Sequence, residues 1–307
     1  MNNLMASKEP FVFIIDFELK KPRLWKISEV DPEEVAFDFS NGGAGRGVEM
    51  KIHGNSFESY RSKFDVVRDH LLYGDSFLTN LTIKTRIEVP LPLRQLFDIS
   101  RAKYKFYLKD SFLVFSPETF VKICDGMIYS YPMKGTIDAS IPDAESKLLS
   151  DKKELSEHVT IVDLIRNDLS MIATEVRVNR FRYIDRIRTN GKDLLQVSSE
   201  ICGKLAPDYS EDPAGALISL LPAGSVSGAP KKRTLDVIRE VEGEERGYYT
   251  GICGIFDGQT LDSGVMIRFI EQSGPHLYYR SGGGITTQSD AISEFQETQD
   301  KIYVPIN

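Results

Sequence analysis

Strand-like segments joined by short turns are the feature that most constrains how this chain folds. Residues 11–16 (FVFIID) form a short apolar run that is typical of a buried strand. Residues 104–131 alternate in strand fashion, with turns near Asp110 and at Asp125–Gly126. Two further segments share this character, residues 180–206 and 248–284. Because hairpins outnumber helical crossovers, the pattern predicts a mixed α+β fold rather than a doubly wound parallel sheet.

Helical periodicity interrupts the strands at several places. The longest helix is predicted from Asp151 to about Glu175, and it opens with a capping box formed by Asp151 and Glu154. A helix is also expected before a turn at Gly74–Asp75, whereas the polar and Gly-rich residues 30–60 are expected to be loop. Other helices are expected at residues 211–221, 231–242 and 290–302, the last with an apolar stripe of Ile292, Phe295, Gln299 and Ile302.

Composition places the chain among ordinary globular proteins. It has 307 residues, 41% of them hydrophobic, and a formal net charge of −7, which does not favour nucleic acid as a partner. The longest charge-free run, residues 214–230, contains two prolines and three glycines, so no membrane helix is expected. No signal peptide is recognisable, and Cys124, Cys202 and Cys253 lie far apart without metal-ligand spacing. We therefore expect reduced core thiols and a cytoplasmic protein.

Three charged residues of the closing helix share one face. Glu294, Glu297 and Lys301 are spaced at i, i+3 and i+7, so their side chains project in the same direction. Two carboxylates one turn apart are suitable ligands for Mg2+, which prefers oxygen ligands and keeps several waters. The same spacing also suits a solvated helix face with a Glu–Lys pair, and the spacing alone does not decide between them.

Two segments rich in small residues are candidates for anion binding. Ser281-Gly282-Gly283-Gly284-Ile285 stands between a predicted strand and the closing helix, where backbone N–H groups can face an anion. A flexible turn is the alternative for this glycine run. The segment from Pro222 to Lys231 has the same two interpretations, and it lacks the residue order of a P-loop.

Taken in order along the chain, six motifs resemble those of the chorismate-binding enzymes. The motifs are SPETF (116–120), PMKGT (132–136), EHVTIVDLIRNDL (157–169), AGSVSGAPK (223–231), RGYYTG (246–251), and SGGGI (281–285) followed by EFQET (294–298). The resemblance covers roughly residues 65–305. It implies a four-layer α/β/β/α sandwich of two packed, mainly antiparallel sheets. It also implies that residues 65–307 form the catalytic core as one continuous domain. A shortened N-terminal part, residues 1–64, is expected to pack on this core.

The resemblance also implies the site. It assigns Mg2+ to Glu157 and Glu297, with Glu294 in or next to the coordination shell. The substrate chorismate is implied to contact Thr136, Ser225, Tyr249, Arg268, Lys301 and the backbone of Gly282, Gly283 and Gly284. Three carboxylates against Arg268 and Lys301 leave a net negative site, which Mg2+ would make positive for a substrate that carries two carboxylates.

Lys134 in PMKGT points to one branch of the family. Anthranilate, isochorismate and salicylate synthases usually have alanine there, whereas one type of aminodeoxychorismate synthase has a lysine that attacks chorismate. Glu118 matches the family carboxylate that protonates the departing hydroxyl. The resemblance thus implies conversion of chorismate and ammonia to 4-amino-4-deoxychorismate, for p-aminobenzoate and folate biosynthesis, through a covalent bond to Lys134.

Two departures from the family pattern bear on the product. Leu78 stands where water-adding members have a lysine base, and leucine cannot activate water. Gln196 stands where relatives have a histidine, and an amide cannot exchange a proton near neutral pH. The first disfavours isochorismate and salicylate synthesis. The second disfavours an aromatic product, or else signals reduced activity.

The source of nitrogen lies outside this chain. Cys253 lies in Gly-Ile-Cys-Gly-Ile, which lacks the last glycine of the GxCxG motif of glutamine amidotransferases. We therefore expect ammonia from solution or from a separate glutamine amidotransferase subunit. Two alternatives remain at this point: the chain is an anthranilate synthase component I, or it is a catalytically weak scaffold subunit for an amidotransferase.

Overall fold

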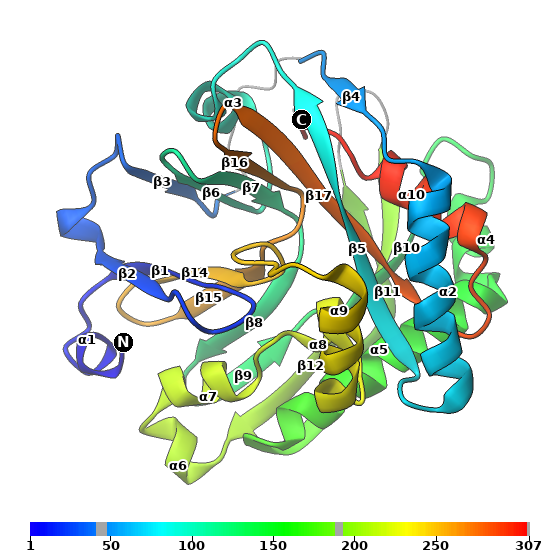
Figure 1. Ribbon diagram of the computed structural model, residues 1–307. Coiled ribbons are helices and arrows are strands. Elements are labelled where there is room, and N and C mark those ends of the chain that lie inside the picture. The colour runs from blue at the N-terminus through cyan, green and yellow to red at the C-terminus, as the bar shows by residue number, and fades with distance from the viewer. Residues whose placement is uncertain (41–47, 188–192, 306–307) are drawn as a thin grey trace.

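Two antiparallel sheets carry the fold in the computed structural model, which describes residues 1–40, 48–187 and 193–305 (Figure 1). The nine-stranded sheet has the order β10 (Met133–Asp138), β12 (Leu194–Leu205), β9 (Met127–Ser130), β8 (Thr119–Cys124), β15 (Leu261–Val265), β14 (Ile252–Phe256), β1 (Phe11–Ile15) and β2 (Arg23–Lys26), while β11 (Ala173–Ile187) also pairs with β12. The eight-stranded sheet has the order β13 (Gly228–Ala229), β5 (Leu78–Glu88), β17 (His276–Ile285), β16 (Phe269–Ser273), β7 (Phe112–Ser116), β6 (Tyr104–Leu108) and β3 (Val35–Asp38), while β4 (Lys51–His53) pairs with β5.

Helices cover the outer face of each sheet. The eight-stranded sheet is covered by α2 (Phe57–Tyr73), α3 (Leu93–Ile99), α9 (Lys231–Glu242) and α10 (Ala291–Asp300). The nine-stranded sheet is covered by α4 (Ala144–Ser150), α5 (Lys152–Ser170) and α7 (Pro213–Ser219). Shorter helical segments are α1 (Asn2–Ala6), α6 (Pro207–Ser210), α8 (Gly224–Ser227) and a 3-10 turn at Ile27–Glu29. The predicted four-layer α+β sandwich is confirmed.

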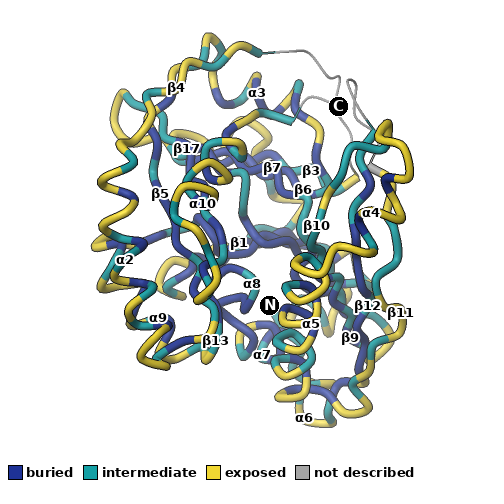
Figure 2. The backbone as a smooth tube through the Cα atoms, turned by 90° about the vertical axis from the view of Figure 1, so that its right-hand side faces the viewer, coloured by how far each residue is buried: buried dark blue, intermediate teal, exposed yellow. Residues whose placement is uncertain are grey.

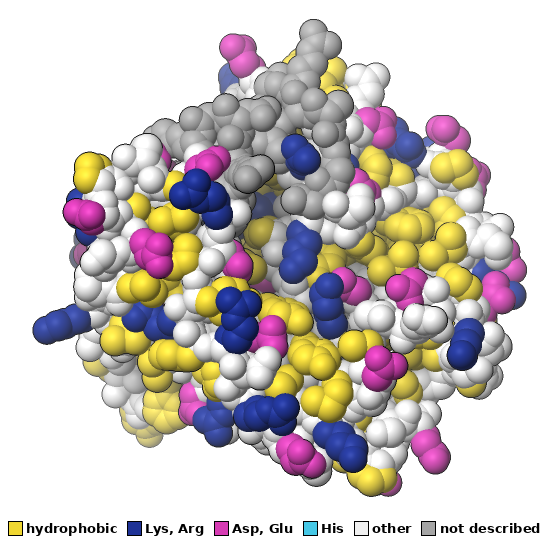
Figure 3. Space-filling view, turned by 180° about the vertical axis from the view of Figure 1, so that it is seen from behind, with side chains coloured by type: hydrophobic (Ala, Val, Ile, Leu, Met, Phe, Trp, Pro, Cys, Tyr) yellow, Lys and Arg dark blue, Asp and Glu magenta, His cyan; other side chains and the backbone are white. Residues whose placement is uncertain are grey.

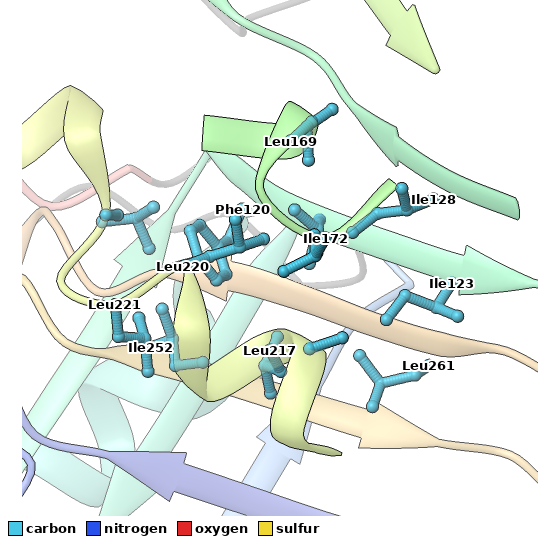
Figure 4. Packing of buried hydrophobic residues seen from close by; sticks show 14 of the residues in the cluster. Phe120, Ile123, Ile128, Leu169, Ile172, Leu217, Leu220, Leu221, Ile252 and Leu261 are labelled. Carbon is cyan, nitrogen blue, oxygen red and sulfur yellow. The ribbon is translucent and has the colours of Figure 1, made fainter. Parts of the chain in front are cut away.

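The hydrophobic core lies in layers between these elements. Val12 and Ile14 of β1 pack against Phe106 and Phe112 from the other sheet, so this cluster holds the two sheets together. A second cluster lies between the nine-stranded sheet and its helices, and Figure 4 shows Leu217 and Leu220 packed toward the strands there. In Figure 2 the central strands such as β1 and β7 are buried, whereas the helices present one exposed face. Each fully buried aliphatic side chain of this kind contributes about 1.5–3 kcal/mol to stability.

The helix boundaries follow the capping signals in the sequence. The Asp151 side chain accepts the N–H of Glu154 at 3.0 Å, so α5 begins where the capping box predicts. The Glu154 side chain lies beside Gly135 instead of returning to the Asp151 N–H, so only half of the box forms. At its other end α5 stops at Ser170, and β11 begins at Ala173, so the predicted helix end near Glu175 is wrong.

The N-terminal segment belongs to both sheets. β1 lies between β14 and β2, β3 pairs with β6, and β4 pairs with β5. Residues 30–60 were expected to be loop, but β3, β4 and the start of α2 fall within this range. The position between residues 64 and 65, where the core is expected to begin, lies inside α2. The strands β3 and β4 form because they pair with β6 and β5, and local polarity does not reveal such pairing.

The closing helix is rotated relative to the predicted apolar stripe. Ile292 is 65% exposed, whereas Glu294 and Thr298 are buried against the sheet. The solvated helix face, which was the alternative to a metal site for these residues, therefore does not hold for Glu294. Here Glu294 faces β17, which is the first sign that this part of the helix serves a site.

Candidate active site

A cavity of about 550 Å³ opens between α5 and β10 on one side and β17 and α10 on the other. These elements stand on opposite sides of the view in Figure 2. The lining of the cavity includes most of the residues that were predicted to form the site. They are Leu78, Glu118, Lys134, Glu157, Gln196, Ser225, Tyr249, Arg268, Gly282, Gly283, Gly284, Glu297 and Lys301. The fold therefore brings together motifs that are spread over most of the chain.

Lys134 and Glu157 form an ion pair in the cavity. Lys134 lies on β10 and its Nζ is 2.7 Å from the Oε2 of Glu157 on α5. Burial disfavours the ammonium form, yet the neighbouring Glu157 carboxylate raises the pKa of Lys134 above its ordinary value. Lys153 approaches the other oxygen of Glu157 at 3.7 Å. In this arrangement Lys134 is protonated, and it must lose a proton before it can act as a nucleophile.

Glu118 lies in the turn between β7 and β8. Its Oε1 accepts a hydrogen bond of 2.5 Å from the hydroxyl of Ser225 on α8. Burial raises the pKa of Glu118, an effect that the Ser225 hydroxyl partly opposes. A carboxyl group that retains its proton in a cavity is suited to donate that proton to a leaving group.

The glycine run lies inside a strand, so the predicted strand end at Arg280 is wrong and the alternative of a flexible turn does not hold. Residues 281–285 belong to β17 and pair with β5, while β16 on the other edge ends opposite Arg280. Along this stretch β17 therefore has a strand on one edge only, and its free backbone groups face the cavity. Lys301 donates a hydrogen bond of 2.8 Å to the Gly282 carbonyl.

Gly283 marks the point where the charged side chains of α10 converge. A Cβ atom at this position would lie 3.4 Å from Glu294 Oε2, 3.8 Å from Lys301 Nζ and 4.0 Å from Glu297 Oε1. Lys301 and Glu297 form an ion pair of 2.6 Å. Burial opposes ionisation of Glu297, but the Lys301 ammonium lowers the pKa of this carboxyl overall. All three charged side chains therefore lie around one point of β17, which supports the predicted shared face of α10.

The donor chemistry of Glu157, Glu294 and Glu297 fits Mg2+. Among the described residues, no group of three or more His, Cys, Asp or Glu side chains is already gathered as a metal site. Mg2+ needs only one or two carboxylates when waters and substrate oxygens complete its shell, so Glu157 and Glu297 are sufficient. The predicted charge count was incomplete, because Lys134 and Lys153 also neutralise Glu157. The site is therefore not net negative without a metal.

The structure does not place every predicted residue in the cavity. Thr136 is exposed and does not line it, because the pairing of β10 with β12 shifts between Met133 and Thr136, and Gly135 adopts a left-handed φ of 83°. Glu294 is buried behind the lining rather than part of it. Arg268 lines the cavity from a left-handed conformation, φ 55°, which is costly for a non-glycine residue and is typical of functional sites.

Several lining residues were missed by the sequence analysis. Asn80, Asp168, Arg280 and Ser281 all line the cavity. The Ser281 hydroxyl is buried and has no hydrogen-bond partner among the described residues. Its position directly before the glycine run was the only signal in the sequence. Asp168 pairs with Lys231 at 3.2 Å, which joins α5 to the start of α9.

Comparison with known proteins identifies the family of the chain. The profile of the chorismate binding enzyme family matches residues 42–307. The chain belongs to this family. An "Uncharacterized PabA-like protein" of Haemophilus influenzae is 47% identical over 99% of this chain and 95% of its own length. Anthranilate synthase component 1 of Cereibacter sphaeroides is 33% identical over 80% of this chain and 51% of its own length, so the chain spans about half of that protein.

Solved structures show the same fold. Anthranilate synthase component I of Streptococcus pneumoniae has a TM-score of 0.69 and 29% identity, covering 85% of this chain and 60% of that one. The menaquinone-specific isochorismate synthase of Escherichia coli has a TM-score of 0.74 at 16% identity, covering 97% and 78%, which supports the fold alone.

Three other expectations can be compared with the structure. Cys202 and Cys253 are buried and Cys124 is partly buried, and all three are free thiols, as predicted. No helix within the described residues is both long and apolar enough to cross a membrane. On the face shown in Figure 3, basic and acidic side chains are interspersed where the chain is described.

Proposed function

We propose that this chain converts chorismate and ammonia to 4-amino-4-deoxychorismate, with Lys134 as the nucleophile. The observation that carries the proposal is the position of Lys134: its amine lies in the cavity that also contains Glu118 and Arg268. A neutral primary amine can form a bond to carbon and later leave as an amine. Lys153 and Lys301 also line the cavity, but Lys153 is 74% exposed and Lys301 is paired with Glu297 and the Gly282 carbonyl.

The proposed reaction has two displacements. In the first, the neutral Lys134 amine forms a bond to C2 of chorismate, both ring double bonds shift (C1=C2 to C1=C6 and C5=C6 to C4=C5), and the C4 hydroxyl leaves as water with a proton from Glu118. In the second, ammonia forms a bond to C4, both double bonds shift back, and the bond between C2 and the Lys134 nitrogen breaks. The hydroxyl is thereby replaced by an amino group, and no oxidant or reductant is needed.

Cationic and backbone donors of the lining would hold the two substrate carboxylates. Arg268, Lys301 and the free edge of β17 at residues 282–284 all face the cavity. Glu157 and Glu297 would hold Mg2+, which supplies positive charge for a substrate carboxylate when it is bound. Tyr249 is buried beside Arg268, and burial raises its pKa to about 12, so its hydroxyl stays a hydrogen-bond donor.

Two lining residues favour this product over those of other family members. Leu78 and Gln196 line the cavity, and neither side chain can serve as a general base for water or for removal of a ring proton. Ammonia needs no such base. The anthranilate synthase relatives make anthranilate the alternative product, and mass spectrometry separates the two because only aminodeoxychorismate retains the enolpyruvyl group.

The test of Lys134 is a covalent adduct. The protein incubated with chorismate and Mg2+ without ammonia should gain about the mass of chorismate less one water, and peptide mapping should place the label on Lys134. Lys134→Ala should lose the adduct and nearly all product, and Lys134→Arg should not rescue, because a guanidinium stays protonated. Lys153→Ala is the matched control, since Lys153 also faces Glu157 but is 74% exposed. Wild-type turnover by Lys134→Ala would overturn the proposal.

Ammonia is proposed to come from solution or from a glutamine amidotransferase subunit. Cys253 is fully buried, and burial raises its pKa well above the ordinary value, so this thiol cannot attack glutamine. The isolated chain should therefore use ammonium, with the rate rising at alkaline pH as free ammonia increases. Glutamine-dependent turnover by the purified single chain would contradict this part of the proposal.

A further inference from the structure

Tyr60 has a buried hydroxyl without a partner. The residue lies in the first turns of α2 and is 1% exposed, with its ring 6.3 Å from that of Phe64 and 5.3 Å from that of Phe295 on α10. Within the described part of the chain its hydroxyl makes no hydrogen bond. A buried donor of this kind carries an uncompensated desolvation cost.

Two other buried tyrosine hydroxyls have partners. Tyr104 donates to Asp262 at 2.7 Å, and Tyr279 donates to the Tyr303 carbonyl at 2.9 Å. The missing partner of Tyr60 is therefore not a general consequence of burying tyrosine in this fold.

The surroundings of Tyr60 identify what its hydroxyl can meet. Phe295, which contacts the Tyr60 ring, directly follows Glu294 in α10. Burial, followed by the nearby charges of Glu294 and Glu297, raises the pKa of Tyr60, so the phenol is neutral and retains its proton. Glu294 is itself 8% exposed, and its Oε2 lies toward Gly283 of β17. A proton donor without an acceptor thus lies close to a buried carboxylate with spare acceptor positions.

We propose that Tyr60 is a positioning residue whose hydroxyl donates a hydrogen bond to the carboxylate of Glu294 when Mg2+ is bound. This inference rests on the proposed metal role of Glu157 and Glu297. Glu294 and Glu297 converge on Gly283, so a cation held by Glu297 acts on Glu294 as well. The bond to Tyr60 then fixes the orientation of Glu294. The metal-free protein carries the cost of an unsatisfied hydroxyl, and the metal-bound protein recovers it.

The test compares Tyr60→Phe with the wild-type protein in the absence and presence of Mg2+. Without metal, Tyr60→Phe should have an equal or higher Tm, because the variant removes an unsatisfied hydroxyl and keeps the ring. With Mg2+, the increase in Tm should be smaller than in the wild type, and the Kd for Mg2+ from titration calorimetry should rise about tenfold. Neither readout depends on turnover.

Tyr104→Phe is the matched control. It also removes one buried phenolic hydroxyl, but that hydroxyl has a partner in Asp262 on the other side of the fold. The control should lower the Tm with and without metal and leave the Kd for Mg2+ unchanged.

Two results would overturn the inference in different ways. Equal Mg2+ affinity of Tyr60→Phe and wild type, or a lower Tm of Tyr60→Phe without metal, would mean that the hydroxyl has a structural role only, for example through a buried water. Failure of the wild type to bind Mg2+ would overturn the metal assignment and this inference together, whereas the Lys134 adduct test would still report on the proposed reaction.

Discussion

Two buried polar clusters lie on either side of the β5–β17 pair, and they differ in how completely their groups are bonded. In the first, Arg246 is 2% exposed and donates to both oxygens of Glu242 and to the carbonyls of Val226 and Asn80. Glu242 also accepts from the backbone and hydroxyl of Thr82. In the second, which comprises Tyr60, Ser281 and Glu294, the hydroxyls of Tyr60 and Ser281 have no hydrogen-bond partner among the residues that the structure describes.

This difference separates a structural cluster from a binding site. A buried ion pair whose hydrogen bonds are complete holds elements in one arrangement and has no free group for a ligand. An incomplete cluster retains donors and acceptors that a ligand can satisfy. The first cluster joins α9, α8 and β5 behind the cavity, and the second cluster lies under the α10 carboxylates.

The largest effect on stability is expected from Arg246→Met. The substitution leaves the Glu242 carboxylate buried without its cation, which should reduce the free energy of unfolding by about 3–5 kcal/mol. Urea unfolding at neutral pH measures this loss. Arg246→Lys should restore only part of it, because one ammonium cannot replace bonds to two carbonyls and two carboxylate oxygens. A loss below about 1 kcal/mol would mean that the complete hydrogen bonding of Arg246 does not make its cluster a structural one.

Glu297→Gln should change function much more than stability. Glu297 is 51% exposed and its pair with Lys301 is partly screened by water, so the free energy of unfolding should change by less than about 1 kcal/mol. Turnover should fall on the order of 100-fold, because the charge for Mg2+ is lost, and excess chelator should have a similar effect on the wild type. Asp300→Asn on the same helix is the control and should retain activity. Full wild-type turnover in excess chelator would exclude the metal.

The smallest effect on stability is expected from a cluster nearer the surface, which is formed by Asp75, Arg233 and His70. It adds a third case to the comparison of the two buried clusters. Asp75 accepts two hydrogen bonds from Arg233 and one from His70, and these partners lower its pKa to about 2. A lowered pKa stabilises the fold above the ordinary value of 3.8, and this contribution is lost as pH falls through about 2. Asp75→Asn should therefore lower the Tm slightly at pH 7, and the difference should shrink as the pH is lowered from 4 toward 2. A difference that is constant with pH would exclude the ion pairs as its cause.

The comparison also shows which parts of the structure the sequence could predict. The helix 231–242 was predicted with its correct ends, because Pro230 before it, Gly243 after it and its apolar spacing are all local signals. The convergence of Glu294, Glu297 and Lys301 followed from helical spacing in the same way.

Pairing between distant segments could not be predicted. Gly282–Gly284 are strand residues because β5 pairs with them, and no local pattern distinguishes that from a flexible turn. Thr136 was expected to contact the substrate because of the family resemblance, but the strand register shifts beside it and its side chain is exposed. Tyr60 was not predicted to be a functional residue, because a single tyrosine in an amphipathic helix is common. Its missing partner is visible only in three dimensions.

The place of β1 in the nine-stranded sheet has a consequence for synthesis on the ribosome. This strand is made before most of its sheet, but one of its edges pairs with β14 at Ile252–Phe256, and β14 in turn connects it to β15 and the rest of the sheet. At about 5–20 residues per second, the apolar run Phe11–Ile15 therefore leaves the ribosome on the order of ten seconds or more before β14 exists. During that interval β2 can pair with one edge of β1, while the edge that faces β14 and the apolar side chains are available to chaperones or to other nascent chains. Late closure of the sheet makes the yield of folded protein in the cell depend on protection of this strand.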